Sequence, residues 1–295
     1  EETPRLQLAL EACFERDAGL REEVQAREAL RKRLTPTAPA SLEAELADQP
    51  LDLFGRPPAL RAGWRPEPVL FDKGRRSFAF RWPGLLKDES HYLRELREGA
   101  PWCELLRADG SVKRSTCWYT RGGCRCDYTY GSDVRVHAVE DAARFLRLME
   151  ELTGQAFRAA RPDWSQEQWP NSANLNLYLD GSQAVGWHAD DESLFLGKEE
   201  DCLIVSLSLG ATREFWLAPR GASAGDSARP DASAITWMNL ENGDLLSMEG
   251  LCQKHYLHCV PNARLSGPRI NVTWRWVKEH KRHCPLSRAE AEQHG

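Results

Sequence analysis

The chain has 295 residues, of which 41% are hydrophobic and 28% are charged, as is ordinary for soluble proteins. No apolar run approaches the roughly 20 residues needed to span a bilayer, so we expect a soluble protein and no membrane partner. The formal net charge of -5 argues against a uniformly basic coat that would bind nucleic acid over the whole surface.

Charge is unevenly distributed along the chain. Residues 1–50 hold 11 acidic and 7 basic side chains, so residues 51–295 together have a balance of only -1. Any phosphate-binding surface must then be a local patch. The candidates for it are Lys73, Arg75, Arg76, Arg81, Lys113, Arg114, Arg121 and Arg125.

The length fits one large domain with an appendage or two domains. From Leu6 to about Leu34, helix-forming residues with apolar positions three and four apart predict a helix, and a Pro-rich connector follows it. We expect residues 1–60 to form this extension, residues 61–284 the main domain, and residues 285–295 a tail.

The first half of the main domain combines helices with a hairpin. Leu85 to Arg97 and Val139 to Thr153 have helical periodicity, and the second helix is predicted to end at Gly154. Between them, Trp102 to Leu106 and Val112 to Tyr119 alternate like the strands of a hairpin. Thr120 to Asp133 has no clear period and is predicted to be a loop.

The second half is β-rich, and turns such as Asn242-Gly243 separate short runs of strand-like sequence. Seven short strands indicate a barrel or a double sheet. A loop rich in small residues, Pro219 to Ala234, is predicted to be a flexible insertion. The strands are Asn174 to Leu179, Leu203 to Leu209, Arg213 to Leu217, Ile235 to Leu240, Asp244 to Met248, His255 to Val260 and Arg269 to Val277.

Two His and one carboxylate leave adjacent positions open on Fe(II), and proteins use this triad for oxygen activation. His188 and Asp190 are two residues apart, so on a strand they project to the same face. His258, on a later strand, is predicted to be the third ligand. His255, three residues earlier, would face the opposite side, and we leave it out of the set.

The last predicted strand places polar side chains on one face. Arg269 and Arg275 are six residues apart, with Asn271 and Thr273 between them on the same side. Buried charge is expensive unless it is paired. A bound dicarboxylate would compensate both guanidinium groups, whose planar forks suit carboxylates.

Several linked motifs between about Lys113 and Val277 then point to a known family. The sequence resembles the AlkB family of nucleic-acid dealkylating dioxygenases, in its eukaryotic DNA-repair branch. The motifs are Trp169-Pro170-Asn171-Ser172, Asn176-Leu177-Tyr178, His188-Ala189-Asp190-Asp191-Glu192, the run from Ser206 to Arg213, Met248-Glu249-Gly250, His258-Cys259-Val260-Pro261 and the run from Arg269 to Arg275.

The resemblance implies an α+β fold. Its core would be a double-stranded β-helix, or jelly roll, over about residues 170–278, with flanking helices. A β-hairpin nucleotide-recognition lid would occupy about residues 100–135, and the helical extension would precede it.

The resemblance also implies the site. Fe(II) would be bound by the catalytic residues His188, Asp190 and His258. The co-substrate 2-oxoglutarate would be held by Asn176, Tyr178, Arg269, Asn271 and Arg275. In the lid, Tyr130 would stack on a flipped base, Tyr128 would position the nucleotide, and Glu192 would contact the base edge; an aromatic platform offsets part of the cost of unstacking.

The implied reaction uses O2 and 2-oxoglutarate to remove N-linked methyl groups from N1-methyladenine or N3-methylcytosine in DNA, releasing formaldehyde, succinate and CO2. RNA demethylation, and oxidation of a non-nucleic substrate on the same scaffold, stay open. The intact triad disfavours a non-catalytic nucleic-acid binder. Cys259 stands where some members have Arg, and this puts substrate choice in doubt.

Cysteine usage bears on location and on a second metal. Nine scattered Cys do not form a secreted disulfide framework, so we expect a reducing compartment, the nucleus or cytoplasm, with organelle targeting left open. We also expect a monomer. Cys117, Cys124 and Cys126 with His137 have poor spacing for zinc, so unligated cysteines are favoured and a metal site there is left open. The tail residues His280, His283 and Cys284 are expected on the surface of a charged terminus.

Overall fold

The computed structural model describes residues 66–86, 89–130, 134–222 and 230–287, with a few helical positions between residues 19 and 26. Apart from those positions, the expected helix from Leu6 to Leu34 and its Pro-rich connector lie outside the described residues. So does the middle of the expected insertion, residues 223–229. None of the described helices is long and apolar enough to cross a membrane.

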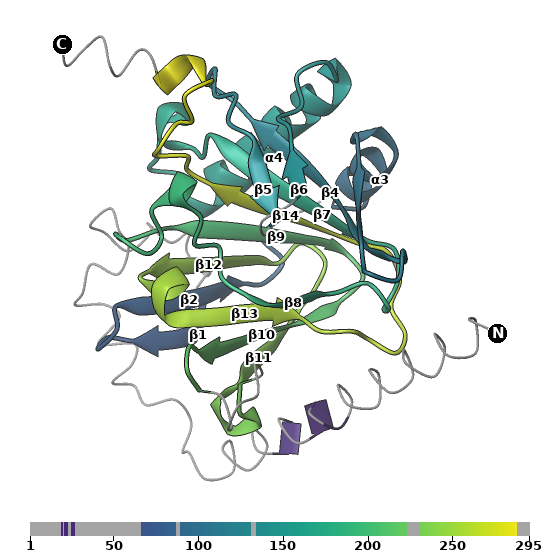
Figure 1. Ribbon diagram of the computed structural model, residues 1–295, viewed down its shortest axis with the longest axis vertical. Coiled ribbons are helices and arrows are strands. Elements are labelled where there is room, and N and C mark those ends of the chain that lie inside the picture. Colours follow the sequence, from purple (N-terminus) through teal and green to yellow (C-terminus); the bar gives the residue numbers. More distant parts are fainter. Residues whose placement is uncertain are drawn as a thin grey trace.

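Two antiparallel sheets form the centre of the molecule (Figure 1). The large sheet has the order β1-β2-β12-β9-β14-β7-β4-β3, and the small sheet the order β11-β10-β13-β8. Strands of the large sheet are β1 Glu67–Asp72, β2 Ser77–Trp82, β3 Cys103–Leu106, β4 Val112–Thr120, β7 Ser172–Tyr178, β9 Ile204–Gly210, β12 Leu245–Gly250 and β14 Arg269–Arg275. Those of the small sheet are β8 Val185–His188, β10 Arg213–Pro219, β11 Thr236–Leu240 and β13 Tyr256–Val260.

Shorter elements complete the described chain. Helices are α3 Glu89–Gly99, α4 Ala143–Ala160 and the single turn α5 Cys252–His255. A two-stranded ribbon joins β5 Tyr128–Tyr130 to β6 Val134–Val136, and three-residue 3-10 turns lie at Gln166–Gln168, Ser193–Phe195 and Ala232–Ala234.

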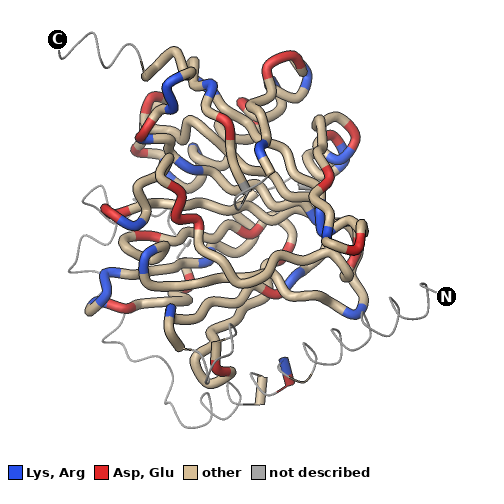
Figure 2. The backbone as a smooth tube through the Cα atoms, in the orientation of Figure 1, with Lys and Arg blue, Asp and Glu red and all other residues tan. Residues whose placement is uncertain are grey.

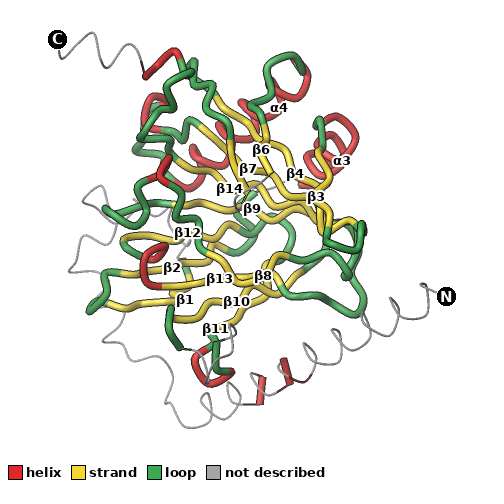
Figure 3. Tube along the Cα trace, viewed as in Figure 1, coloured by secondary structure: helices red, strands yellow, loops and turns green. Residues whose placement is uncertain are grey.

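Strand alternation divides the large sheet into an apolar face and a polar face. On β14, Ile270, Val272 and Trp274 are fully buried in a core shared with α3 and α4, and Figure 3 shows both helices beside this sheet. The opposite face turns Arg269 and Arg275 toward the small sheet, and a second core joins the two sheets. This arrangement is consistent with the expected double-stranded β-helix.

All seven strands predicted in the second half are present, with each end within two residues of the prediction. The hairpin is also confirmed: β3 pairs with β4 around a turn in which Gly110 has φ 82°. The sequence prediction missed β1, β2, β6 and β8, and it assigned β5 to a loop.

The predicted stop of the second helix at Gly154 is wrong. Helix α4 continues to Ala160, because Ala156, Phe157 and Ala160 extend its buried face. Gly154 is itself buried, and an added Cβ would meet the Arg158 guanidinium at 3.0 Å. The residue therefore leaves room for a neighbouring side chain and does not end the helix.

The contact between α4 and the large sheet can be tested at Trp274. Its ring meets Phe157 edge-on at 5.4 Å between centroids, and its Nε1 donates to Thr153 Oγ1 at 3.0 Å. Trp274→Ala should lower the free energy of unfolding by about 3–5 kcal/mol, as usual for large-to-small changes in a core. Denaturant titration measures the free energy of unfolding. The control Trp276→Ala, at a half-buried position, should lower this free energy by less than Trp274→Ala does.

Candidate active site

The three predicted metal ligands converge where β8 meets β13. His188 and His258 are directly opposed across this pair of strands, with ring centroids 4.2 Å apart. Asp190 Oδ1 lies 3.9 Å from His188 Nε2, and Oδ2 lies 3.9 Å from His258 Nε2. The strand β8 ends at His188, so Asp190 comes from the chain just beyond it and not, as expected, from the strand itself.

Neighbouring groups orient two of the three ligands. His188 Nδ1 lies 2.8 Å from the Gly186 carbonyl oxygen, so a proton on Nδ1 donates to it and leaves Nε2 available to a metal. The Asp190 backbone N–H donates to Gln253 Oε1 at 2.9 Å. Gln253 is fully buried and was not predicted from the sequence, because it acts on Asp190 from α5, more than sixty residues away.

The electrostatics favour the protonation states that a divalent cation needs. Burial acts to raise the pKa of Asp190, but the Arg275 guanidinium, 2.6 Å away, and the two imidazoles hold it well below its usual range. Burial, and then the neighbouring imidazole, lower the pKa of His258 to about 3. Burial likewise lowers the pKa of His188. The set is two neutral imidazoles and one carboxylate.

A cavity of about 600 Å³ opens in front of these ligands. Residues from both sheets and from the β5–β6 ribbon line it. Among the predicted residues, the lining includes the three metal ligands together with Asn176, Tyr178, Asn271, Arg275, Tyr128 and Glu192.

Arg269 lies behind this wall. Its Nη2 donates to Ser208 Oγ at 2.8 Å, and its guanidinium lies 5.6 Å from the centre of the Tyr178 ring. Its Nε and Nη1 are buried and have no hydrogen-bond partner among the described residues. Burial lowers its pKa to about 10. A buried cation with unused donors fits a carboxylate ligand.

Another part of the cavity lining combines Tyr128 with Glu192. The Tyr128 ring is packed between Trp118, at 5.0 Å, and Phe195, at 6.2 Å, and its hydroxyl donates to Glu192 Oε1. The ring is therefore part of the core while the hydroxyl group faces the cavity. The Tyr130 side chain lies outside the described residues, so its predicted stacking on a base stays a prediction.

The eight basic residues suggested as a phosphate patch do not form one patch. Figure 2 shows basic and acidic residues interspersed over the described chain. Lys113 and Arg114 line the cavity, and Arg114 Nε donates to Asn176 Oδ1 at 2.7 Å. Five others pair with carboxylates: Arg75 with Asp72, Arg76 with Asp201, Arg81 with Asp244, Arg121 with Glu150 and Arg125 with Glu140.

Two imidazoles and one carboxylate between facing antiparallel sheets define the site of a non-haem iron oxygenase. Comparisons with known proteins agree. The 2OG-Fe(II) oxygenase superfamily matches residues 86–275. A human protein named alpha-ketoglutarate-dependent dioxygenase alkB homolog 3 is 32% identical over 217 residues, which are 69% of this chain and 68% of that protein.

Two further relatives cover shorter stretches. DNA oxidative demethylase ALKBH2 from Arabidopsis thaliana is 36% identical over 124 residues, 36% of this chain and 38% of its own. Human DNA oxidative demethylase ALKBH2 is 32% identical over 109 residues, 36% of this chain and 40% of its own. The solved structure of OsALKBH1 aligns with 71% of this chain at TM-score 0.44 and 18% identity, too distant to bear on function.

The chain therefore belongs to the AlkB-like family of the 2OG-Fe(II) oxygenase superfamily. It is a 2-oxoglutarate-dependent dioxygenase, and Fe(II), 2-oxoglutarate and O2 are the cofactor and co-substrates of its family. The donor set fits the metal, because the three ligand atoms lie within 4.8 Å of one another.

Two histidines that are close in sequence allow the metal-ligand assignment to be tested. His258 belongs to the converging set, whereas His255 ends the helical turn α5 and lies outside it. His258→Ala should weaken Fe(II) binding by more than about 100-fold, since even partners outside the metal shell cost 10–100-fold. His255→Ala should bind normally. Anaerobic titration with Fe(II), or with Mn(II) as a stable substitute, measures both; equal affinities in the two variants would refute the assignment.

Proposed function

We propose that this chain oxidatively demethylates N1-methyladenine and N3-methylcytosine in DNA. One observation supports this more than any other: a single cavity joins the His188, Asp190 and His258 set to the buried acidic wall made by Glu192 and Tyr128. Two similar proteins are named DNA oxidative demethylases, which agrees with the proposal.

In this reaction we assign a role to each predicted site residue. His188, Asp190 and His258 hold Fe(II), and Asn176, Tyr178, Arg269, Asn271 and Arg275 hold 2-oxoglutarate. Tyr128, Tyr130 and Glu192 contact the nucleotide. When bound, iron with 2-oxoglutarate and O2 supplies the oxidant that hydroxylates the N-methyl group, and the adduct collapses to formaldehyde and the restored base.

Glu192 is suited to recognise an alkylated base. Burial, and then the charge of Asp190, raise the pKa of Glu192 to about 7. Its Oε2 is buried without a partner among the described residues. N1-methyladenine and N3-methylcytosine are cations with an exocyclic amino group, so such a base would provide an N–H donor and hold the carboxylate in its charged form.

We place the phosphate backbone of the substrate beside Lys113, which lines the cavity. Burial, followed by the charges of Arg114 and Arg107, lowers the pKa of Lys113, so a phosphate beside these cations would relieve their mutual repulsion.

We further propose that the protein is a monomer working in a reducing compartment, the nucleus or cytoplasm. In support, the eight described cysteines are free of disulfides.

The substrate is tested with methylated oligonucleotides. The chain should release formaldehyde from single- or double-stranded DNA containing either base, strictly dependent on 2-oxoglutarate, and His188→Ala should release none. A higher kcat/KM on methylated RNA would replace the DNA assignment. Turnover of 2-oxoglutarate without demethylation of any oligonucleotide would refute the nucleobase proposal and leave the oxygenase intact.

The co-substrate assignment is tested at Arg269. Arg269→Lys keeps the positive charge but loses the planar fork that grips a carboxylate. The KM for 2-oxoglutarate should rise by about 30-fold or more, since breaking a buried charged pair costs about 2–5 kcal/mol. Arg121→Lys, at a site paired with Glu150 outside the cavity, serves as the control with unchanged KM. An unchanged KM in Arg269→Lys would remove it from the co-substrate site.

A further inference from the structure

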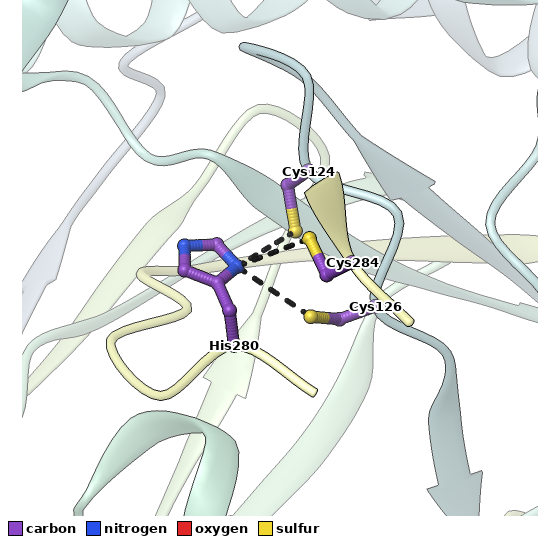
Figure 4. Close-up of side chains that lie close together, drawn as sticks. All are labelled: Cys124, Cys126, His280 and Cys284. Carbon is purple, nitrogen blue, oxygen red and sulfur yellow. Dashed lines mark hydrogen bonds between the residues drawn. The ribbon is translucent and has the colours of Figure 1, made fainter. Parts of the chain in front are cut away.

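A second cluster of metal-binding side chains lies apart from the cavity. It brings Cys124 and Cys126, from the loop between β4 and β5, together with His280 and Cys284, which follow β14 (Figure 4). The three cysteines are 0–4% exposed. The prediction that Cys284 lies on the surface of a charged tail is therefore wrong.

The distances between the ligand atoms match tetrahedral coordination of a metal ion. His280 Nδ1 lies 3.7 Å from Cys124 Sγ, 3.5 Å from Cys126 Sγ and 3.4 Å from Cys284 Sγ. Tetrahedral bonds of the usual zinc–sulfur and zinc–nitrogen lengths require about 3.6 Å between nitrogen and sulfur. All four ligand atoms also lie within 4.8 Å of one another, where about 3.8 Å is required between sulfurs.

Hydrogen bonding alone does not account for this arrangement. A neutral imidazole Nδ1 has either one proton or one lone pair, so it can satisfy only one of three thiols that converge on it. Two backbone N–H groups also donate to the sulfurs: Arg125 to Cys284 and Lys281 to Cys126, each at 3.3 Å. Such donors stabilise thiolates that ligate a metal.

We propose that Cys124, Cys126, His280 and Cys284 bind one structural Zn²⁺ ion. Three thiolates and one imidazole complete a closed four-ligand shell of the kind that structural zinc sites use. Binding displaces the thiol protons to solvent. The set replaces the grouping first considered from the sequence, because Cys117 packs in the core beneath the helices and His137 bonds to Asp127.

The zinc ion would hold together two segments that are far apart in sequence, next to the cavity wall made by Glu192 and Tyr128. Cys126 stands two residues before Tyr128, and its carbonyl oxygen accepts from Trp118 Nε1 at 2.7 Å. Lys281 Nζ donates to the Asp127 carbonyl oxygen at 2.8 Å. Zinc therefore anchors the chain from which the Tyr128 hydroxyl reaches Glu192, although it lies outside the cavity itself.

Metal analysis of the purified full chain tests the proposal without any activity assay. The double variant His188→Ala/His258→Ala first disables the dioxygenase site, so that this site cannot take up the ion, and it leaves the buried Asp190–Arg275 ion pair in place. About one zinc per chain should survive dialysis against a mild chelator in this background. Cys126→Ser or Cys284→Ser should lose that zinc, whereas Cys117→Ala should retain it. Substitution with Co(II) should give the visible bands of tetrahedral sulfur-rich coordination.

Variants at His280 distinguish the loss of a zinc ligand from a general folding defect. His280→Cys restores a fourth ligand, so it should keep zinc with an altered Co(II) spectrum, whereas His280→Ala should lose it. Losing the ion should lower the Tm by about 5 °C or more, since each kcal/mol shifts a domain of this size by about 2–4 °C. Absence of zinc from the double variant, or a disulfide between any two of the three cysteines in the intact mass, would overturn the proposal.

Discussion

The ion pair between Arg275 and Asp190 is the contact on which the rest of the site depends. Arg275 belongs to the large sheet and Asp190 follows a strand of the small sheet, and both side chains are almost completely buried. Either charge alone would be very costly in this position. The pair therefore holds the sheets at a defined separation and aims the carboxylate at His188 and His258. The same guanidinium also faces the rings of Tyr128 and Phe195, at 5.4 and 5.3 Å.

Local patterns in the sequence were sufficient for much of this architecture. Strict alternation along β14 separates Ile270, Val272 and Trp274 from Arg269 and Arg275, and it correctly predicted that the polar side chains share one face. The three predicted metal ligands do converge, and the sequence could indicate them because His188 and Asp190 are close in sequence and His258 lies in a β-strand context. Gly154 shows the limit of a local rule, since packing on both sides of it outweighs its low helix propensity.

Interactions between distant segments could not be predicted from one sequence. Gln253 supports Asp190 from α5, and His280 meets Cys126 across more than 150 residues of chain. No periodicity encodes such proximity. For the same reason, eight basic residues between Lys73 and Arg125 suggested a local patch, whereas acidic partners from distant segments pair with four of them. Strand pairing, which brings these partners together, is itself a long-range event.

Arg269 links the binding of the co-substrate to the stability of the fold. Two of its N–H groups are buried without partners among the described residues, and an unmade hydrogen bond in such a place destabilises the folded state. A dicarboxylate that fills the space would remove this penalty, so part of its binding free energy comes from relief of a cost already present. By thermodynamic linkage, the folded chain is then stabilised by the same molecule that it consumes, and its lifetime depends on the concentration of its own co-substrate.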